Sequence, residues 1–164
     1  MKTNITNKAI VTMKSMTKAL VLGLTALILA GTAVAQDQVT RPFFAQSHVE
    51  VVIDLSTGAW YAMNEGTATH LGHFTGEAEG ISQPSIVGEG ILNAANGDQV
   101  FTCFENPTGG QEGAVQYITG GNGRFENATG EAIQTQHNVF YDFLTNPGFL
   151  IITYDEVLVG TITY

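Results

Sequence analysis

Hydrophobic and polar residues alternate along much of this chain, and no segment after residue 35 shows the spacing of an amphipathic helix. Alternation with a period of two is typical of β-strands that have one buried face. The pattern is clear at His48–Asp54, where Val49, Val51 and Ile53 share one face and predict a first strand. Residues 36–47 predict a loose lead-in to this strand, because the residue before Pro42 is disfavoured in a helix.

Further strands are predicted at short intervals. Trp60–Thr75 predicts one or two strands, and the glycine- and acid-rich segment Gly76–Gly90 contains a loop. The Asn96-Gly97 pair then predicts a hairpin between the apolar segments Glu89–Leu92 and Gln99–Glu105, because asparagine and glycine favour two-residue hairpin turns.

Two apolar segments follow near the end of the chain. Glu131–Leu144 predicts a strand pair or one long bent strand, and Phe149–Tyr164 predicts a last strand with a possible bend or bulge at Asp155-Glu156. The residues 138–144 and 149–154 are apolar on both faces, which indicates burial on both sides. Seven to nine strands predict an all-β sandwich or barrel. The two-sided strands favour an antiparallel barrel covered by a second subunit or another segment.

The stretch Ile118–Ala132 reads I-T-G-G-N-G-R-F-E-N-A-T-G-E-A. Glycine and asparagine adopt positive φ at low cost, so this composition predicts a tight β-connection. Phe125 can fill a core there, and we expect Arg124 to hold the loop through backbone carbonyls or a carboxylate. A structural role is therefore assigned to Gly120, Gly121, Gly123, Arg124, Phe125 and Gly130.

The first 35 residues predict a signal peptide that is removed. Lys14 and Lys18 precede a short apolar run at residues 19–30, and Ala33-Val34-Ala35 provides the small residues of a cleavage site. The translation start could be Met1, Met13 or Met16, and the sequence does not distinguish them. We expect an exported protein, periplasmic or extracellular, with one barrel domain at residues 48–164 and no membrane span after cleavage.

Removal of this leader would leave a strongly acidic chain. Arg41 and Arg124 would be its only basic residues apart from histidine, against fifteen carboxylates, a formal charge of −13. Such a chain repels nucleic acids and anionic membranes. Cys103 is the single cysteine, so no internal disulfide can form; it lies in an apolar strand pattern, V-F-T-C-F, which predicts a buried and inert thiol.

Candidate sites with chemistry are few. His70 and His73 are spaced i, i+3, which puts them on opposite faces of a regular strand, so a metal site is not expected unless a bulge realigns them. Glu77 and Glu79 share a strand face, as a pair of glycosidase carboxylates could, but the surrounding glycines and acids indicate a solvated edge. No motif for a cofactor, nucleotide or nucleophilic serine is present. We predict no catalytic residue, no metal and no cofactor.

Three segments together resemble the allene oxide cyclase-like barrel family. They are A-T-H-L-G-H-F-T-G (68–76), A-A-N-G-D-Q (94–99) and T-G-G-N-G-R-F-E-N-A-T-G (119–130), and the final G-T-I-T-Y (160–164) is similar too. The family is related to plant dirigent proteins, and the resemblance implies an eight-stranded antiparallel barrel around an apolar cavity, often trimeric. None of the cyclase active-site residues can be placed on this sequence by motif.

The functional expectation is an exported barrel that binds a small apolar ligand or acts through assembly as a homo-oligomer, a trimer or a dimer. The alternatives are a cofactor-free isomerase or cyclase acting on a hydrophobic substrate, and a purely structural extracellular component. Whether the interior is open or filled decides between these. The expected lining of a cavity is aromatic: Trp60, Tyr61, Phe101, Phe104, Tyr117, Phe140 and Tyr141.

Overall fold

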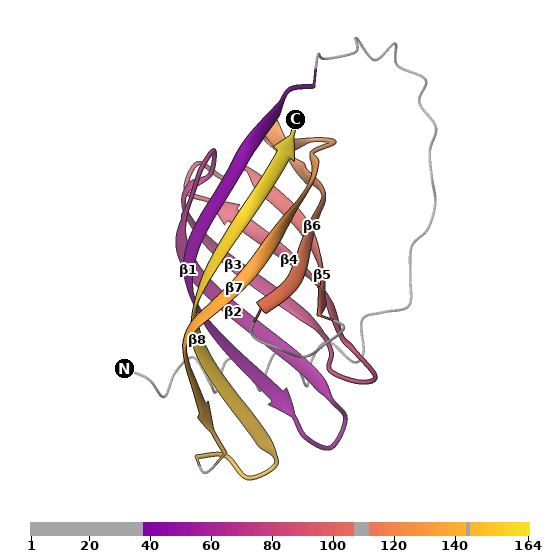
Figure 1. The fold of residues 1–164 in the computed structure, drawn as a ribbon, viewed down its shortest axis with the longest axis vertical. Helices are drawn as coiled ribbons and strands as arrows, with labels where there is room; N and C mark the ends of the chain where they lie inside the picture. Colours follow the sequence, from indigo (N-terminus) through magenta and orange to yellow (C-terminus); the bar gives the residue numbers. More distant parts are fainter. Residues whose placement is uncertain (1–37, 107–111, 144) are drawn as a thin grey trace. The chain divides into compact units, whose positions relative to one another are not determined.

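The structure is a computed structural model that describes residues 38–106, 112–143 and 145–164. The predicted signal peptide, residues 1–35, lies outside the described residues. Eight strands follow one another in chain order and close into a barrel in which every neighbouring pair is antiparallel (Figure 1). The elements are β1 (Thr40–Asp54), β2 (Ala59–Ala68), β3 (Gly72–Ile81), β4 (Ile86–Ala94), β5 (Gln99–Asn106), β6 (Glu112–Asn122), the short 3₁₀ helix η1 (Gly123–Phe125), β7 (Thr129–Asp142) and β8 (Phe149–Thr163). The predicted all-β antiparallel barrel of eight strands is confirmed.

The first strand begins earlier than the sequence pattern predicted. β1 pairs with β8 from Thr40 onward, so most of the expected lead-in at residues 36–47 is strand. Pro42 is tolerated in β1 because of the direction of its backbone nitrogen. The N–H of Phe44 points toward Thr69, on the β2 side, and the nitrogen of Pro42, two residues earlier, points to the same side. β2 pairs with β1 only from Ala45, so the missing N–H of Pro42 breaks no ladder bond.

The glycine-rich segment 76–90 is mostly strand rather than loop. It contains the second half of β3 and the start of β4, and only residues 82–85 connect them. The predicted loop is therefore present, but it is short, because the glycines on either side of it are strand residues that packing inside the barrel requires, as described below. Of the one or two strands predicted over Trp60–Thr75, the structure has two, β2 and the start of β3, joined by a turn at residues 69–71.

The predicted irregularity at Asp155-Glu156 lies instead on the neighbouring strand. β8 continues without a break from Phe149 to Thr163, whereas the register of β7 shifts between His137 and Phe140. Asn138 has φ 53 at this point, a left-handed conformation that asparagine tolerates better than most residues. The extra residue makes this a β-bulge, and of the two alternatives predicted for this segment the structure has one long bent strand, β7, which ends at Asp142.

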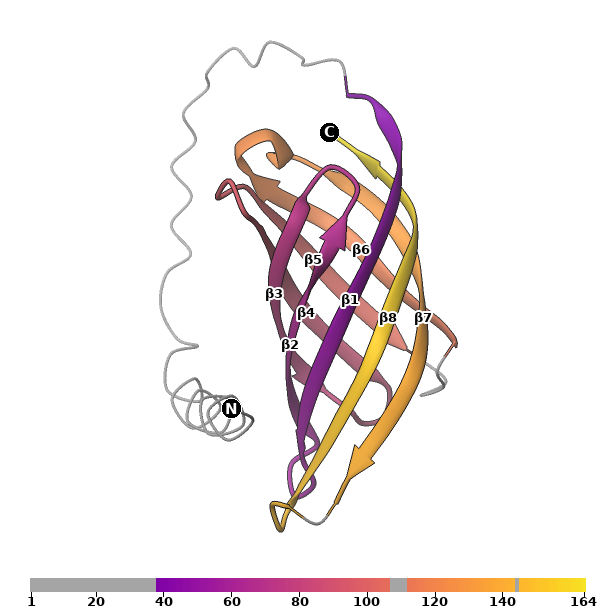
Figure 2. The ribbon, with the colours of Figure 1, turned by 90° about the vertical axis from the view of Figure 1, so that its left-hand side faces the viewer.

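One end of the barrel is filled by an apolar core. The chain reversals at that end are β2–β3, β4–β5 and the η1 connection, and the last residue, Tyr164, lies there too (Figures 1 and 2). The fully buried side chains of this apolar core include Phe74, Phe125, Leu158 and Ile162. We call this the closed end, and the opposite end, where β1–β2 and β7–β8 turn, the open end. No helix among the described residues has the length and apolarity needed to cross a membrane.

Candidate functional site

The interior of the barrel toward the open end contains a cavity of about 210 Å³. Its lining comes from all eight strands, as expected for a space on the barrel axis. Val49, Val51, Ile53 and Ile152 form one apolar wall, contributed by β1 and β8. Tyr141 also lines the cavity and is 47% exposed, so the cavity opens to solvent near the end of β7.

The space exists because β3 and β4 carry very small residues on their inner faces. Trp60 pairs across the strands with Gly80, Gly80 with Gly88, and Gly88 with Phe104. The indole ring lies over the two glycines, since a Cβ at Gly80 would come within 2.8 Å of it and a Cβ at Gly88 closer still. It meets Phe104 edge-on, with ring centroids 6.2 Å apart. Trp60 and Phe104 therefore form an aromatic wall.

The floor of the cavity is polar and is centred on Glu156. The carboxyl group is buried at 6% exposure and accepts a hydrogen bond from the Ser47 hydroxyl at 2.7 Å. Gln134 Nε2 donates to its other oxygen, and the Asn64 side chain also hydrogen-bonds it. Gly76 is needed beside Asn64, because a Cβ there would collide with the amide oxygen.

Two acceptor atoms of this floor have no partner among the described residues. They are Asn64 Oδ1 and Gln134 Oε1, both buried, and Gln134 as a whole is 2% exposed. A buried acceptor without a donor costs free energy, roughly 1–3 kcal/mol. Both atoms have almost no accessible surface, so they lie within the floor, made of Glu156, Asn64 and Gln134, and not on the surface that faces the cavity.

Both ionisable groups deep in the cavity have shifted pKa values. Burial raises the pKa of Glu156 above its usual range, and the hydrogen bonds from Ser47, Gln134 and Asn64 oppose this only in part. Burial, followed by repulsion from the Glu156 charge, also raises the pKa of Tyr154, two residues earlier on the same face of β8. A carboxyl group with a raised pKa holds a proton that it can donate to a bound molecule, whereas the raised pKa of Tyr154 keeps its phenol protonated.

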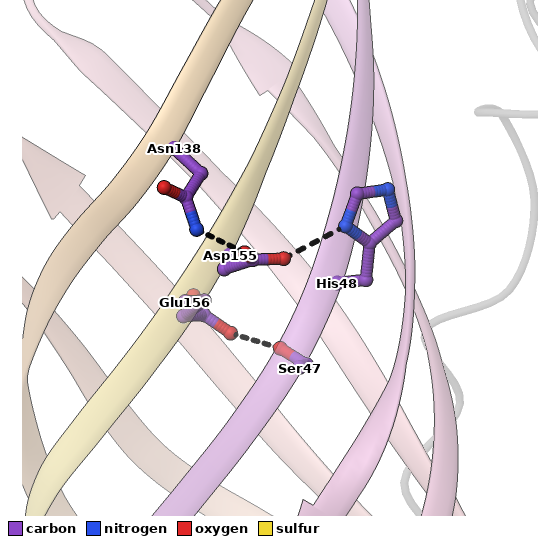
Figure 3. Close-up of polar contacts among 5 residues, drawn as sticks. All are labelled: Ser47, His48, Asn138, Asp155 and Glu156. Atoms are coloured by element: carbon purple, nitrogen blue, oxygen red, sulfur yellow. Dashed lines mark hydrogen bonds and ion pairs between the residues drawn. The ribbon is translucent and has the colours of Figure 1, made fainter.

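A second polar cluster lies directly behind Glu156, on the outer face (Figure 3). Asp155 accepts a hydrogen bond from Asn138 Nδ2 at 2.7 Å and contacts His48 Nδ1 at 3.0 Å. The Asn138 bond, followed by that from His48, lowers the pKa of Asp155. Asp155 thereby holds the β7 bulge, which reverses the alternation of the strand: Gln134 faces inward before the bulge and Tyr141 after it.

Three of the seven predicted lining residues line the cavity: Trp60, Phe104 and Tyr141. The other four are not among its lining residues. Three of them occupy the alternate positions of their strands, which face outward: Tyr61, Phe101 and Tyr117. The fourth, Phe140, follows the bulge in β7 and lies on the outer face. The sequence shows which residues are aromatic. It did not show which face of each strand points into the barrel, and this decides whether an aromatic side chain lines the cavity.

The glycine motif lies at the closed end, away from the cavity. Phe125 is fully buried in the apolar core, and Gly123 has φ +62, which requires glycine. Arg124 Nε is 3.0 Å from Asp98 Oδ2, and its guanidinium lies 4.9 Å from the Phe125 ring centroid. Gly121 and Gly130 approach the backbone of neighbouring strands too closely for a side chain, and Gly120 packs near the Phe101 ring.

The remaining candidates do not form a site. His70 bonds the Pro42 carbonyl at 2.9 Å, whereas His73 contacts Glu65 at 3.2 Å on the exposed face of β3. No group of three metal-ligating side chains occurs among the described residues. Cys103 was expected to be buried but is partly exposed, because the odd positions of β5 face outward.

Glu77 and Glu79 share the outer face of β3, since the even positions of that strand face the interior. Both side chains are exposed, as expected for a solvated edge.

Sequence reasoning missed the floor entirely. Glu156, Tyr154, Ser47, Asn64 and Gln134 were not singled out, because each is an ordinary residue in an ordinary strand. One signal was present: the even positions of β8 read Ile152, Tyr154, Glu156, Leu158, Gly160 and Ile162. A lone carboxylate in an otherwise apolar series with period two indicates a buried acid.

Comparisons with known proteins show a similarity of fold. The chain is similar to the structure of the pterocarpan synthase dirigent protein GePTS1, at 18% identity over 85% of this chain and 99% of that chain, with a TM-score of 0.48. No protein-family model matches the sequence, and no curated protein matches it. The barrel architecture rests on the strand pairing of this chain, and the similarity carries no argument about its function.

Proposed function

We propose that this protein binds a small apolar molecule inside the open half of its barrel. The observation that carries the proposal is the cavity of about 210 Å³ between the Val49–Ile152 side and the aromatic wall of Trp60 and Phe104. The other half of the same barrel holds a cluster of buried apolar side chains, whereas this cavity lies toward the open end. A side chain at Gly80 or Gly88 would displace the aromatic wall, which shows how the chain keeps this interior shape.

The size of the cavity limits the ligand. Pockets for drug-sized molecules range from about 300 to 1,000 Å³, so this one suits a smaller molecule, such as one with a single ring. Burial of about 250 Å² of apolar ligand surface at about 25 cal/mol per Å² gives roughly 6 kcal/mol before the cost of association. Affinities between micromolar and millimolar are therefore expected. A longer chain would extend past Tyr141 into solvent.

A neutral probe with one ring, such as ethylbenzene, tests this proposal by calorimetric titration. The wild type should bind it, and a second small apolar molecule should compete with it. Ala78→Phe fills the cavity from the inner face of β3 and should abolish this binding. Thr75→Phe adds the same side chain to the exposed outer face of that strand and should leave it intact. Equal binding by both variants would place the probe outside the barrel.

A second candidate function is a cofactor-free isomerase or cyclase with a hydrophobic substrate. It is favoured by the presence of Glu156 in the cavity, since burial raises the pKa of this carboxyl group and the group can donate a proton to a bound molecule. Product analysis of a bound ligand distinguishes it from simple binding. A catalyst would convert the ligand, and Glu156→Gln would stop conversion without preventing binding; a binder would return the ligand unchanged.

We further propose that the barrel acts after export and as a homo-oligomer. Export is supported by the leader-like sequence of residues 1–35. Self-association is supported by a row of apolar side chains that crosses the outer face of β1, β8, β7 and β6 in direct register: Phe44, Val159, Ile133 and Val115. Phe44, Val159 and Ile133 are 41%, 57% and 50% exposed, and such a patch is typical of an interaction surface. The third alternative, a purely structural extracellular component, would not need an interior cavity.

A further inference from the structure

The acceptor groups on the cavity floor suggest what the ligand carries. Glu156 receives donors from Ser47, Gln134 and Asn64, while Asn64 Oδ1 and Gln134 Oε1 remain without donors among the described residues. A neutral hydrocarbon would offer the Glu156 carboxyl group no partner. A ligand with an N–H donor in the cavity could pair with this group, because Glu156 lines the cavity.

The Glu156 carboxyl group has no cationic partner among the described residues that line the cavity. No lysine, arginine or histidine is among the residues that line the cavity within the described part of the chain. Arg41 lies 5.4 Å from the Tyr164 ring centroid, and Arg124 pairs with Asp98, so both guanidinium groups are occupied at the closed end. A buried carboxylate normally has a cationic partner, because an unpaired buried charge is costly.

The walls next to the floor are suited to a positive charge. Trp60, Phe104 and Tyr154 present aromatic surfaces to the cavity, and a cation over the face of a tryptophan or tyrosine ring is attracted by its quadrupole. The acidic chain adds a negative field, which raises the local concentration of cations and repels anions. An anionic ligand such as a fatty acid would meet Glu156 at the floor.

We propose that the ligand of this cavity is a small apolar amine in its protonated form, whose ammonium group pairs with the carboxylate of Glu156. This inference rests on the proposed ligand-binding function and names the chemical class of the ligand. An ammonium group has donors and no acceptor, so it matches a carboxyl group that lines the cavity without a cationic partner among the described lining residues. The apolar body then lies between the aromatic and aliphatic walls.

Proton linkage gives the proposal a second signature. Burial keeps the Glu156 carboxyl neutral to a higher pH than usual, and the arriving ammonium stabilises its ionised form. Binding below the folded-state pKa of Glu156 therefore releases one proton to solvent, and affinity rises with pH through that pKa. Other groups that face the floor are Tyr154 and Tyr141; Glu89 also lines the cavity, and Asp155 and His48 lie on the outer face of the same strands.

Three ligands of one size test the inference: 2-phenylethylamine, 2-phenylethanol and ethylbenzene. Calorimetric titration at pH 7.5 should show the amine binding the wild type at least tenfold more tightly than the alcohol, as expected for hydrogen bonds to a charged group. Glu156→Gln should remove this preference and the proton release. Glu131→Gln removes one exposed carboxylate from the outer face of β7 and should keep both.

The outcomes separate the two proposals. Equal binding of amine and alcohol by the wild type would overturn the amine assignment and leave the ligand-binding function standing. A preference for the amine that persists in Glu156→Gln would also overturn it, because the charge would then be recognised elsewhere. Failure of all three ligands to bind would reject the amine assignment together with the ligand-binding proposal. The wild-type comparison decides even if Glu156→Gln does not fold.

Discussion

Replacement of Glu156 by glutamine should stabilise the barrel at high pH. The native fold raises the pKa of this carboxyl group by burial, so folding is favoured while the group is protonated. The unfolded chain ionises it near the usual value of about 4.3. The stability that the wild type has with a protonated Glu156 is therefore fully present below that pH. It is lost as the pH rises toward the pKa of Glu156 in the folded protein. Glutamine is neutral throughout and does not incur this loss.

The size of the effect follows from linkage. Over each pH unit in which the folded group is protonated and the unfolded group ionised, the wild type loses about 1.4 kcal/mol. A domain of this length unfolds with an entropy that converts about 1 kcal/mol into roughly 4 °C of Tm. The difference in Tm between Glu156→Gln and wild type should thus widen by up to about 5 °C per pH unit above pH 4.5.

Circular dichroism melts between pH 4 and pH 8 would measure this difference. Glu131→Gln serves as the charge-matched control, since it removes an exposed carboxylate from a neighbouring strand. Its difference from wild type should stay small and nearly constant with pH. A constant Tm difference for Glu156→Gln, or a variant that becomes relatively less stable as pH rises, would show that Glu156 is ionised and well solvated in the native barrel.

Four further predictions concern other parts of the chain. Asp155→Asn should lower Tm at pH 7, and its Tm should approach that of the wild type in acid. The reason is that a carboxylate with a lowered pKa in the folded protein adds stability that is fully present only above its pKa in the unfolded chain; a larger Tm difference in acid would contradict this. Asn138→Val should cost about 1–3 kcal/mol in urea unfolding and weaken probe binding, whereas Asn138→Gly, which tolerates positive φ, should bind normally. Arg124→Ala should lower stability by about 1 kcal/mol and Arg41→Ala by less, since Arg124 has both an ion pair and a ring contact; equal losses would refute this. Val159→Asp should dissociate the oligomer in sedimentation while Ile91→Asp on the far strands should not, and a monomeric wild type would reject the proposed self-association.

The strand architecture could be predicted from the sequence because alternation and turn residues are local signals. The pattern at His48–Asp54 and the turn at Asn146-Pro147-Gly148 both correspond to observed elements. The extent of the glycine-rich strands β3 and β4 could not be predicted, for a physical reason. Gly80 and Gly88 accommodate the Trp60 side chain from another strand, and this requirement is invisible until the register is known.

The binding site could be predicted only in part. Trp60 and Phe104 were identified by residue type, but Tyr61 and Phe101 were wrongly grouped with them because strand parity decides which side faces inward. The bulge at Asn138 reverses that parity within β7, so no fixed alternation predicts the position of Tyr141. The floor combines residues from β1, β2, β7 and β8, and such long-range contacts leave no spacing signal in the sequence.

We propose above that the open half of the barrel holds a ligand. A crystal structure of the wild type grown with 2-phenylethylamine and, separately, with 2-phenylethanol tests this proposal most directly. We expect density for the phenyl ring inside the cavity, beside the aromatic wall of Trp60 and Phe104, in at least one of the two crystals. An interior filled by rearranged side chains, with ligand density only on the outer face or absent in both crystals, would contradict it.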